Sequence, residues 1–177
     1  MRLYEGQASN AGTGMPFAYY ERLSKSQKAI YDRSDGIVQI RLPAAILLRP
    51  LVAELAEALT REDRELTQRA CQRLLDRLTQ ALGVVPVRVE VLAARPHARW
   101  GELHGLYTEA RAGRFPKITL WMRTARQRKV VAFRTFLRTL LHELCHHLDY
   151  ELLKLDDSFH TEGFFKRESS LFKQLIA

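Results

Sequence analysis

Two histidines four positions apart, with a glutamate directly after the first, form the part of this chain best suited to chemistry. They stand in the run His142-Glu143-Leu144-Cys145-His146. On an α-helix, residues four apart are about 6 Å apart along the axis and project from the same face. Both imidazoles can therefore reach one tetrahedral metal ion. Glu143 is then placed to reach a water on the metal rather than the metal itself.

The chemistry that this pattern predicts is metal-assisted hydrolysis. Zn²⁺ held by neutral imidazoles lowers the pKa of its bound water from ~15.7 to about 7, which makes a nucleophile at neutral pH. Glu143 is the predicted general base, which takes the proton of that water and passes it to the leaving amine. The alternative is that the pattern arose by chance. In that case, two histidines without a metal and a glutamate would lie on the buried side of a strongly apolar helix, where burying polar groups is unfavourable.

The motif lies in a stretch with helical periodicity. Apolar residues recur roughly every 3.6 positions over residues 130–150, and neither Pro nor Gly interrupts them. Cys145 is predicted to be a small buried residue on the core side, with a ligand or redox role as the alternative. His147 points about 100° away from His146 and is predicted to support or pack. Asp149 returns to the metal face, where it either orients a ligand imidazole or faces water.

A catalytic zinc site needs a third protein ligand, and the chain after the motif offers His160. The metzincin continuation is excluded, because it requires a glycine and a histidine where this chain has Asp149 and Leu152. His160 follows a polar break and begins a predicted helix over residues 160–175. The apolar face of that helix is formed by Phe164, Leu171 and Leu175. His97 and His104, earlier in the chain, are assigned to surface or core roles.

Residues 130–175 resemble the SprT-like zinc metallopeptidases, a group that includes Spartan and the related minimal gluzincin-like proteases. In that family the motif helix is followed by a short excursion and a histidine with an aromatic residue four positions later. His160 and Phe164 match that pair, whereas the family's usual glycine after the histidine is Thr161 here. The resemblance implies a zincin-like fold and a zinc site of three histidines. Glu162 and Glu168 are the fallback ligands for a site of two histidines and one glutamate.

Length and composition favour one globular domain. The chain has 177 residues, 46% of them apolar, which suits a single domain with a hydrophobic core. No run approaches the ~18 apolar residues of a membrane span, and the N-terminus lacks the apolar region of a secretory signal. Only Cys71 and Cys145 are present, so no disulfide framework is predicted. We expect a cytoplasmic protein with no membrane association. The oligomeric state is not indicated.

Positive charge is concentrated just before the motif. The net charge is +8, and residues 111–138 hold nine Lys or Arg and no acid. They are Arg111, Arg114, Lys117, Arg123, Arg126, Arg128, Lys129, Arg134 and Arg138. One interpretation is a solvated rim that keeps the protein in solution. The other is a surface that faces a polyanion and brings the site next to nucleic acid.

The pattern along the chain predicts an α+β fold. Residues 1–16 are predicted to be a flexible N-terminal arm, and residues 17–177 a single zincin-like metallopeptidase domain with N-terminal helices and a small mixed or antiparallel sheet. A short helix is predicted after Ser24, a helix over residues 44–60, and a third between a Thr60–Asp63 capping box and Gly83. A short strand or extended segment is predicted at residues 37–42, and strands are predicted at residues 84–92, 103–109 and 117–122. The last of these is predicted to be the edge that pairs with an extended substrate.

These expectations together describe a zinc-dependent endopeptidase that acts on a protein or peptide substrate. His142, His146 and His160 hold the metal, and Glu143 is the general base. The first alternative is a binding module in which the metal is structural, with a closed fourth coordination position. The second is a nucleic-acid-binding protein that carries a vestigial motif, which salt-dependent DNA binding without a metal requirement would favour.

Overall fold

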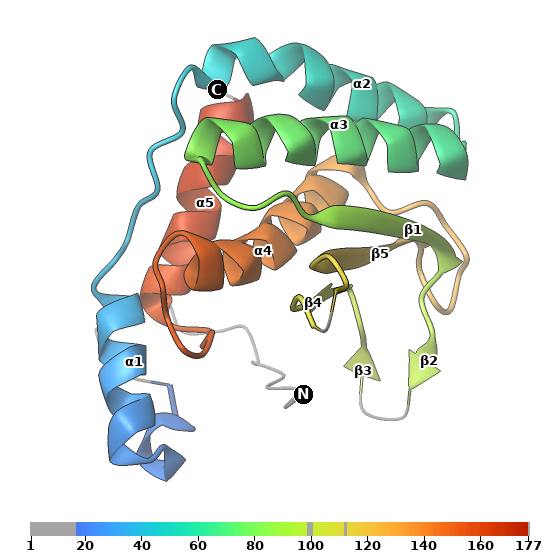
Figure 1. Ribbon diagram of the computed structural model, residues 1–177. Coiled ribbons are helices and arrows are strands. Elements are labelled where there is room, and N and C mark those ends of the chain that lie inside the picture. Colours follow the sequence, from blue (N-terminus) through green and yellow to red (C-terminus); the bar gives the residue numbers. More distant parts are fainter. Residues whose placement is uncertain (1–16, 99–100, 112, 177) are drawn as a thin grey trace.

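The computed structural model describes residues 17–98, 101–111 and 113–176, which form an α+β fold (Figure 1). The α-helices are α1 (Lys25–Asp35), α2 (Arg49–Thr60), α3 (Arg64–Leu82), α4 (Phe133–Glu151) and α5 (Glu162–Ile176), with short 3-10 helices η1 (Tyr20–Arg22) and η2 (Ala45–Leu48). The strands are β1 (Arg88–Ala94), β2 (His97–Ala98), β3 (Gly101–Glu102), β4 (Gly105–Thr108) and β5 (Lys117–Arg123). The arm predicted for residues 1–16 lies outside the described residues. Within the described ranges, no helix has the length and apolar character needed to cross a membrane.

Side-chain caps set the ends of α1 and α3. Ser24 and Gln27 form a capping box at the start of α1, each side chain accepting the other residue's N–H. The carboxylate of Asp63 caps α3, which ends at Gly83 in the left-handed conformation with φ 65°. The prediction of Gly83 as a helix end is confirmed. The prediction that Thr60 begins this helix is wrong, because Thr60 is the last residue of α2 and Asp63 is the cap.

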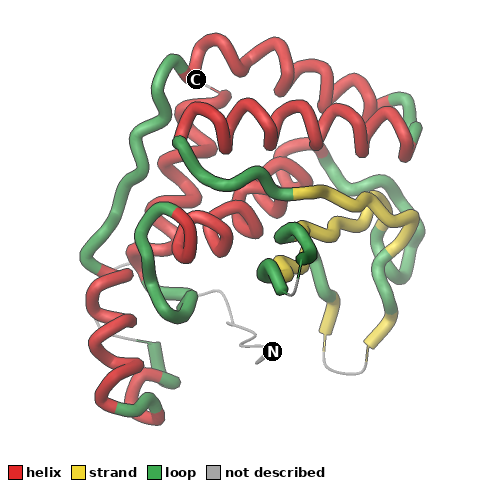
Figure 2. The backbone as a smooth tube through the Cα atoms, viewed as in Figure 1, coloured by secondary structure: helices red, strands yellow, loops and turns green. Residues whose placement is uncertain are grey.

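Residues 37–42 were predicted to be a short strand or an extended segment, and the strand alternative is wrong, because this segment pairs with no described strand. It forms part of the loop that connects α1 with η2 (Figure 2). The side chain of Gln174 on α5 accepts the N–H of Leu42 and donates to the carbonyl of Ile40. One side chain thus supplies backbone hydrogen bonds that a neighbouring strand would otherwise provide.

The main sheet is mixed and has the order β1-β5-β4, with β1 parallel and β4 antiparallel to β5. The prediction of residues 117–122 as an edge is therefore wrong, because β5 has a strand on each side. The outer side of β1 is bonded by α3. Gln72 accepts the N–H of Val89 and donates to the carbonyl of Val87, and Gln68 accepts the N–H of Val91. Within the described residues, β4 is the edge of this sheet that α3 does not cover.

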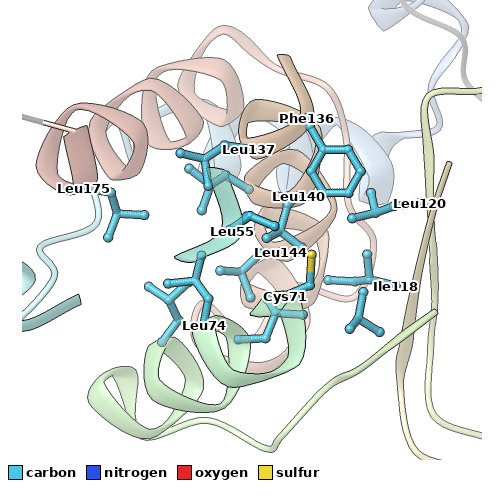
Figure 3. Close-up of a cluster of buried hydrophobic side chains, with 14 of the residues drawn as sticks. Leu55, Cys71, Leu74, Ile118, Leu120, Phe136, Leu137, Leu140, Leu144 and Leu175 are labelled. Atoms are coloured by element: carbon cyan, nitrogen blue, oxygen red, sulfur yellow. The ribbon is translucent and has the colours of Figure 1, made fainter. Parts of the chain in front are cut away.

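The hydrophobic core joins the sheet to the helices and holds α4 in place. Figure 3 labels Leu55 on α2, Cys71 and Leu74 on α3, Ile118 and Leu120 on β5, Phe136, Leu137, Leu140 and Leu144 on α4, and Leu175 on α5. Burial of each large aliphatic side chain contributes roughly 1.5–3 kcal/mol. Cys145 belongs to the same cluster and is 0% exposed, so its predicted core position is confirmed. The apolar face of α4 is thereby fixed by the core.

Candidate metal centre

The three histidines predicted as ligands meet at one point. His142 and His146 project from α4. His160 lies in the segment between α4 and α5, two residues before the first residue of α5, and not inside a helix as predicted. The Nε2 atom of His160 is 3.0 Å from Nε2 of His142 and 3.0 Å from Nε2 of His146. Along the described part of the chain, these three residues are the group close enough to hold a metal ion, with one ligand atom from each within 4.8 Å of the others.

The other ring nitrogen of two histidines is already bonded, and these bonds set the tautomers. His142 Nδ1 is 3.0 Å from the carboxylate of Glu168. An ionised carboxylate only accepts, so Nδ1 carries the proton. His146 Nδ1 is 2.7 Å from Ser158 Oγ, which donates its own proton to Asp149 and therefore accepts from the ring. Both rings present an unprotonated Nε2 to the shared point, which is the form that a metal ion requires.

The distances and the donor set fit a tetrahedral divalent ion. Imidazole nitrogens bound 2.0–2.1 Å from a zinc ion at tetrahedral angles are about 3.3 Å apart. The two separations that involve His160 are 3.0 Å, and all three ligand atoms lie within 4.8 Å of one another. Hydrogen bonds among the rings cannot satisfy two unprotonated nitrogens at once, because His160 Nε2 has at most one proton to donate. Burial, with His160 and His142 nearby, holds the pKa of His146 well below its usual value, so this ring stays neutral. These residues can hold a metal ion.

The ring of Phe164 packs against the imidazole rings of all three histidines. Its ring centroid is 5.0 Å from that of His142, 4.8 Å from that of His146 and 5.1 Å from that of His160. Phe164 is fully buried, and its N–H donates to Thr161 Oγ1 at the start of α5. Phe164 therefore contacts His160, four positions before it in the chain, and also the other two histidines.

Glu143 lies where α4 passes β4. It is 6% exposed, and the backbone N–H of Tyr107 donates to its carboxylate. A Cβ atom added at Gly105 would lie only 2.5 Å from Glu143 Oε1, so β4 can approach the carboxylate only with glycine at this position. Burial raises the pKa of Glu143 to about 7, against the opposing effects of His142 and the Tyr107 hydrogen bond. A carboxyl group with a pKa near neutrality is suited to accept and return a proton.

The two glutamates considered as fallback ligands lie outside the cluster, and that assignment is corrected. Glu168 bonds Nδ1 of His142 and accepts a second bond from Arg138 at 3.0 Å. Its role is to orient the His142 ring from behind. Glu162 pairs with Lys166 at 2.7 Å. Neither carboxylate belongs to the group of side chains that the described residues offer to a metal ion.

Two other histidines, His147 and His104, are separate from the ligand cluster. His147 is fully buried and bonds the Tyr107 hydroxyl at 3.1 Å and the carbonyl of Val85 at 2.7 Å, so its predicted packing role is confirmed. His104 is not part of the metal-binding group. The side chain of His97 lies outside the described residues, and its assignment stays a prediction.

Residues that support the site include several that the sequence did not single out. Asp149 is fully buried and does not face water. It accepts hydrogen bonds from Ser158 at 2.7 Å and from Arg167 at 2.8 Å. Ser158 in turn hydrogen-bonds Nδ1 of His146, so Asp149 is connected to this ligand through Ser158. No local pattern marks Arg167 as buried, because its partners are 18 and 133 residues away. Gly105 has a weak signal, since a lone glycine in a strand often marks a close approach.

Several of the basic residues near the site are paired with acids. Lys117 pairs with Glu90 at 2.7 Å, Arg123 with Glu62 at 2.6 Å and Arg138 with Glu168 at 3.0 Å. Arg134 and Arg138 also lie over the ring of Phe172, at 5.2 and 4.4 Å. The positive charge of residues 111–138 is therefore partly neutralised within the fold.

No protein-family model, curated protein or solved structure matches the chain. Function is therefore inferred from the site itself. Its defining features are three converging imidazole nitrogens, a buried carboxyl group on the same helix, and hydrogen bonds that fix two of the ligand rings.

Proposed function

We propose that this protein is a zinc-dependent metallopeptidase with a zincin-like fold, as its resemblance to the SprT-like family implies. The observation that carries the proposal is the convergence of His142, His146 and His160 at their Nε2 atoms, with Glu143 on the same helix. Three neutral nitrogen ligands with a fourth position left for water are the arrangement of catalytic zinc sites.

The residues of the site have two proposed roles, which are to hold the metal and to transfer a proton. A zinc ion held by three imidazoles supplies a water of lowered pKa and polarises the substrate carbonyl. Glu143 accepts the proton of the attacking water at its carboxylate and returns it to the leaving amine, a role worth ~10²–10⁴ in rate. Glu168 and Ser158 hold the rings of His142 and His146 in the orientation that exposes Nε2.

The edge strand β4 is the element that we assign to substrate pairing. An extended peptide can add to a sheet only at an open edge. Here β5 is central and β1 is bonded along its outer side by Gln68 and Gln72. β4 also lies against Glu143, through Gly105 and Tyr107. A peptide aligned along β4 would thus run past the general base.

A structural metal site in a binding module is the competing function. It requires a fourth protein ligand to close the coordination sphere. The described residues group three histidines and no fourth His, Cys, Asp or Glu at this point. An open fourth position therefore favours hydrolysis over a purely structural role.

The test separates metal binding from hydrolysis. Glu143→Gln keeps the shape of the side chain and removes the base, so zinc content should stay at the wild-type level while casein hydrolysis falls by at least ~10². Glu162→Gln is the matched control, since it makes the same change at an exposed ion pair near the site. It should change neither zinc content nor hydrolysis. Wild-type activity in Glu143→Gln would remove Glu143 from the mechanism.

A further inference from the structure

The segment that carries His160 is held by residues near the start of the described chain. The hydroxyl of Tyr19 donates to the backbone carbonyl of His160 at 2.9 Å. Phe159, the residue before the ligand, is 1% exposed and packs with the rings of Tyr19 and Tyr31 at centroid distances of 6.4 and 6.2 Å. Residues more than 125 positions away in the sequence therefore contact the backbone of the third ligand and the residue before it.

The end of α1 also caps the beginning of α5. A helix N-terminus has N–H groups without partners inside the helix. Thr161 Oγ1 accepts the N–H of Phe164, and the carboxylate of Asp35 accepts the N–H of Gly163 at 2.8 Å. A Cβ atom at Gly163 would collide with the backbone carbonyls of Ser34 and Asp35. The absence of a side chain at Gly163 thus allows α1 to meet α5 directly after the ligand (Figure 1).

A buried arginine connects α1 to a second ligand. Arg167 of α5 is 0% exposed and donates to the carbonyls of Ser34 and Ile37, both at 2.6 Å. Its other amino group donates to Asp149 at 2.8 Å. Asp149 then accepts from Ser158, which bonds His146 Nδ1. The carbonyls at the end of α1 therefore orient Arg167, and the chain of hydrogen bonds continues to His146.

We propose that contacts from Tyr19, Ser34, Asp35 and Ile37 hold the metal centre and set its affinity for the ion. Tyr19 and Asp35 are positioning residues for His160, and Ser34 and Ile37 act on His146 through Arg167. His160 lies in a segment without regular secondary structure, so its position depends on these contacts. Residues that orient metal ligands from behind typically change metal affinity by about 10–100-fold. This inference rests on the metal-binding part of the proposed function and not on hydrolysis.

The experiment compares variants that break contacts to the ligand segment with variants that break a similar contact elsewhere. Tyr19→Phe removes the bond to His160, and Asp35→Ala removes the cap on Gly163. The controls are Tyr20→Phe and Asp32→Ala. Tyr20 and Asp32 form a 3.1 Å hydrogen bond with each other on the exposed surface of the same region, and each control removes one partner of that bond. The dissociation constant for Zn²⁺ is measured by competition with a chromophoric chelator, on the full chain and without substrate.

We expect Tyr19→Phe to bind Zn²⁺ about three- to tenfold more weakly, as for the loss of one hydrogen bond. Asp35→Ala should bind at least as weakly, and both controls should match the wild type. Circular dichroism of the metal-free proteins verifies that the helices persist. Equal zinc affinity in the target and control variants overturns this inference alone. A wild-type chain that takes up no zinc overturns both the inference and the proposed function.

Discussion

Replacing Gly105 with alanine should impair hydrolysis while leaving the metal bound. The added Cβ atom would lie 2.5 Å from Oε1, 2.7 Å from Cγ and 2.9 Å from Cδ of Glu143. An ordinary van der Waals contact begins near 3.4 Å, so Oε1 must retreat by about 0.9 Å, the difference between 3.4 and 2.5 Å. All three atoms belong to one side chain and none to the backbone, so the displaced group is the carboxylate that we propose as the general base.

The size of the effect follows from that displacement. A misplacement of about 1 Å in a catalytic geometry reduces the rate by about 10²-fold, which corresponds to ~2.7 kcal/mol in the activation free energy. The Glu143 side chain can move without distorting the fold, so the midpoint of thermal unfolding should change little. None of the atoms that the added Cβ would meet belongs to His142, His146 or His160, so zinc content should stay at the wild-type level.

The assay is kcat/KM for a fluorescent casein substrate, together with zinc content and thermal unfolding. Gly36→Ala is the matched control, because a Cβ atom there meets only Asp32 O at 3.5 Å and Arg33 O at 3.8 Å, and the backbone φ is −67°. The control should be fully active. If Gly105→Ala hydrolyses the substrate as fast as the wild type, β4 does not position Glu143, and the assignment of β4 as the substrate strand loses its support.

Two further predictions concern the third ligand and the basic segment. His160→Ala should lose most bound zinc and all hydrolysis while its circular dichroism spectrum stays helical, because two imidazoles leave the ion under-coordinated; a full equivalent of zinc with continued cleavage would place the third ligand elsewhere. If residues 111–138 face a polyanion, DNA affinity should fall steeply with added salt, and the double reversal Arg126→Glu with Lys129→Glu should weaken it further. The same reversal on α3, at Arg69 and Arg77, is the control and should have a smaller effect. Absence of DNA binding at low salt would leave the segment as a solvated rim.

The motif helix was predictable because its signals are local. The apolar period over residues 130–150 predicted α4 and its buried face, and Cys145 lies in the core as that period implies. Gly83 ends α3 because a left-handed residue is needed there, which glycine adopts without strain. Such features depend on residues within one or two helical turns, so a sequence window contains all of the information they require.

The errors occurred where partners come from distant segments. Residues 37–42 have the composition of a strand, but Gln174 bonds the N–H of Leu42 and the carbonyl of Ile40, and no described strand pairs with the segment. Residues 117–122 form a strand as predicted, yet their central place depends on β1 and β4 pairing from both sides. Alternation of apolar residues indicates that a strand exists, and it does not specify the order of strands in a sheet.

The sequence by itself indicated that His142 and His146 can bind a metal ion and predicted Glu143 as the general base. The spacing of His142 and His146 on a helix places both imidazoles on one face, and Glu143 follows from the same register. Only the tertiary structure decided that His160 completes the cluster and that Glu168 lies behind a ligand instead of binding the metal. The reason is physical. A helix fixes neighbours four residues apart through its own backbone, whereas contacts across 18 to 141 residues exist only after the core has packed and the buried polar groups have found their partners.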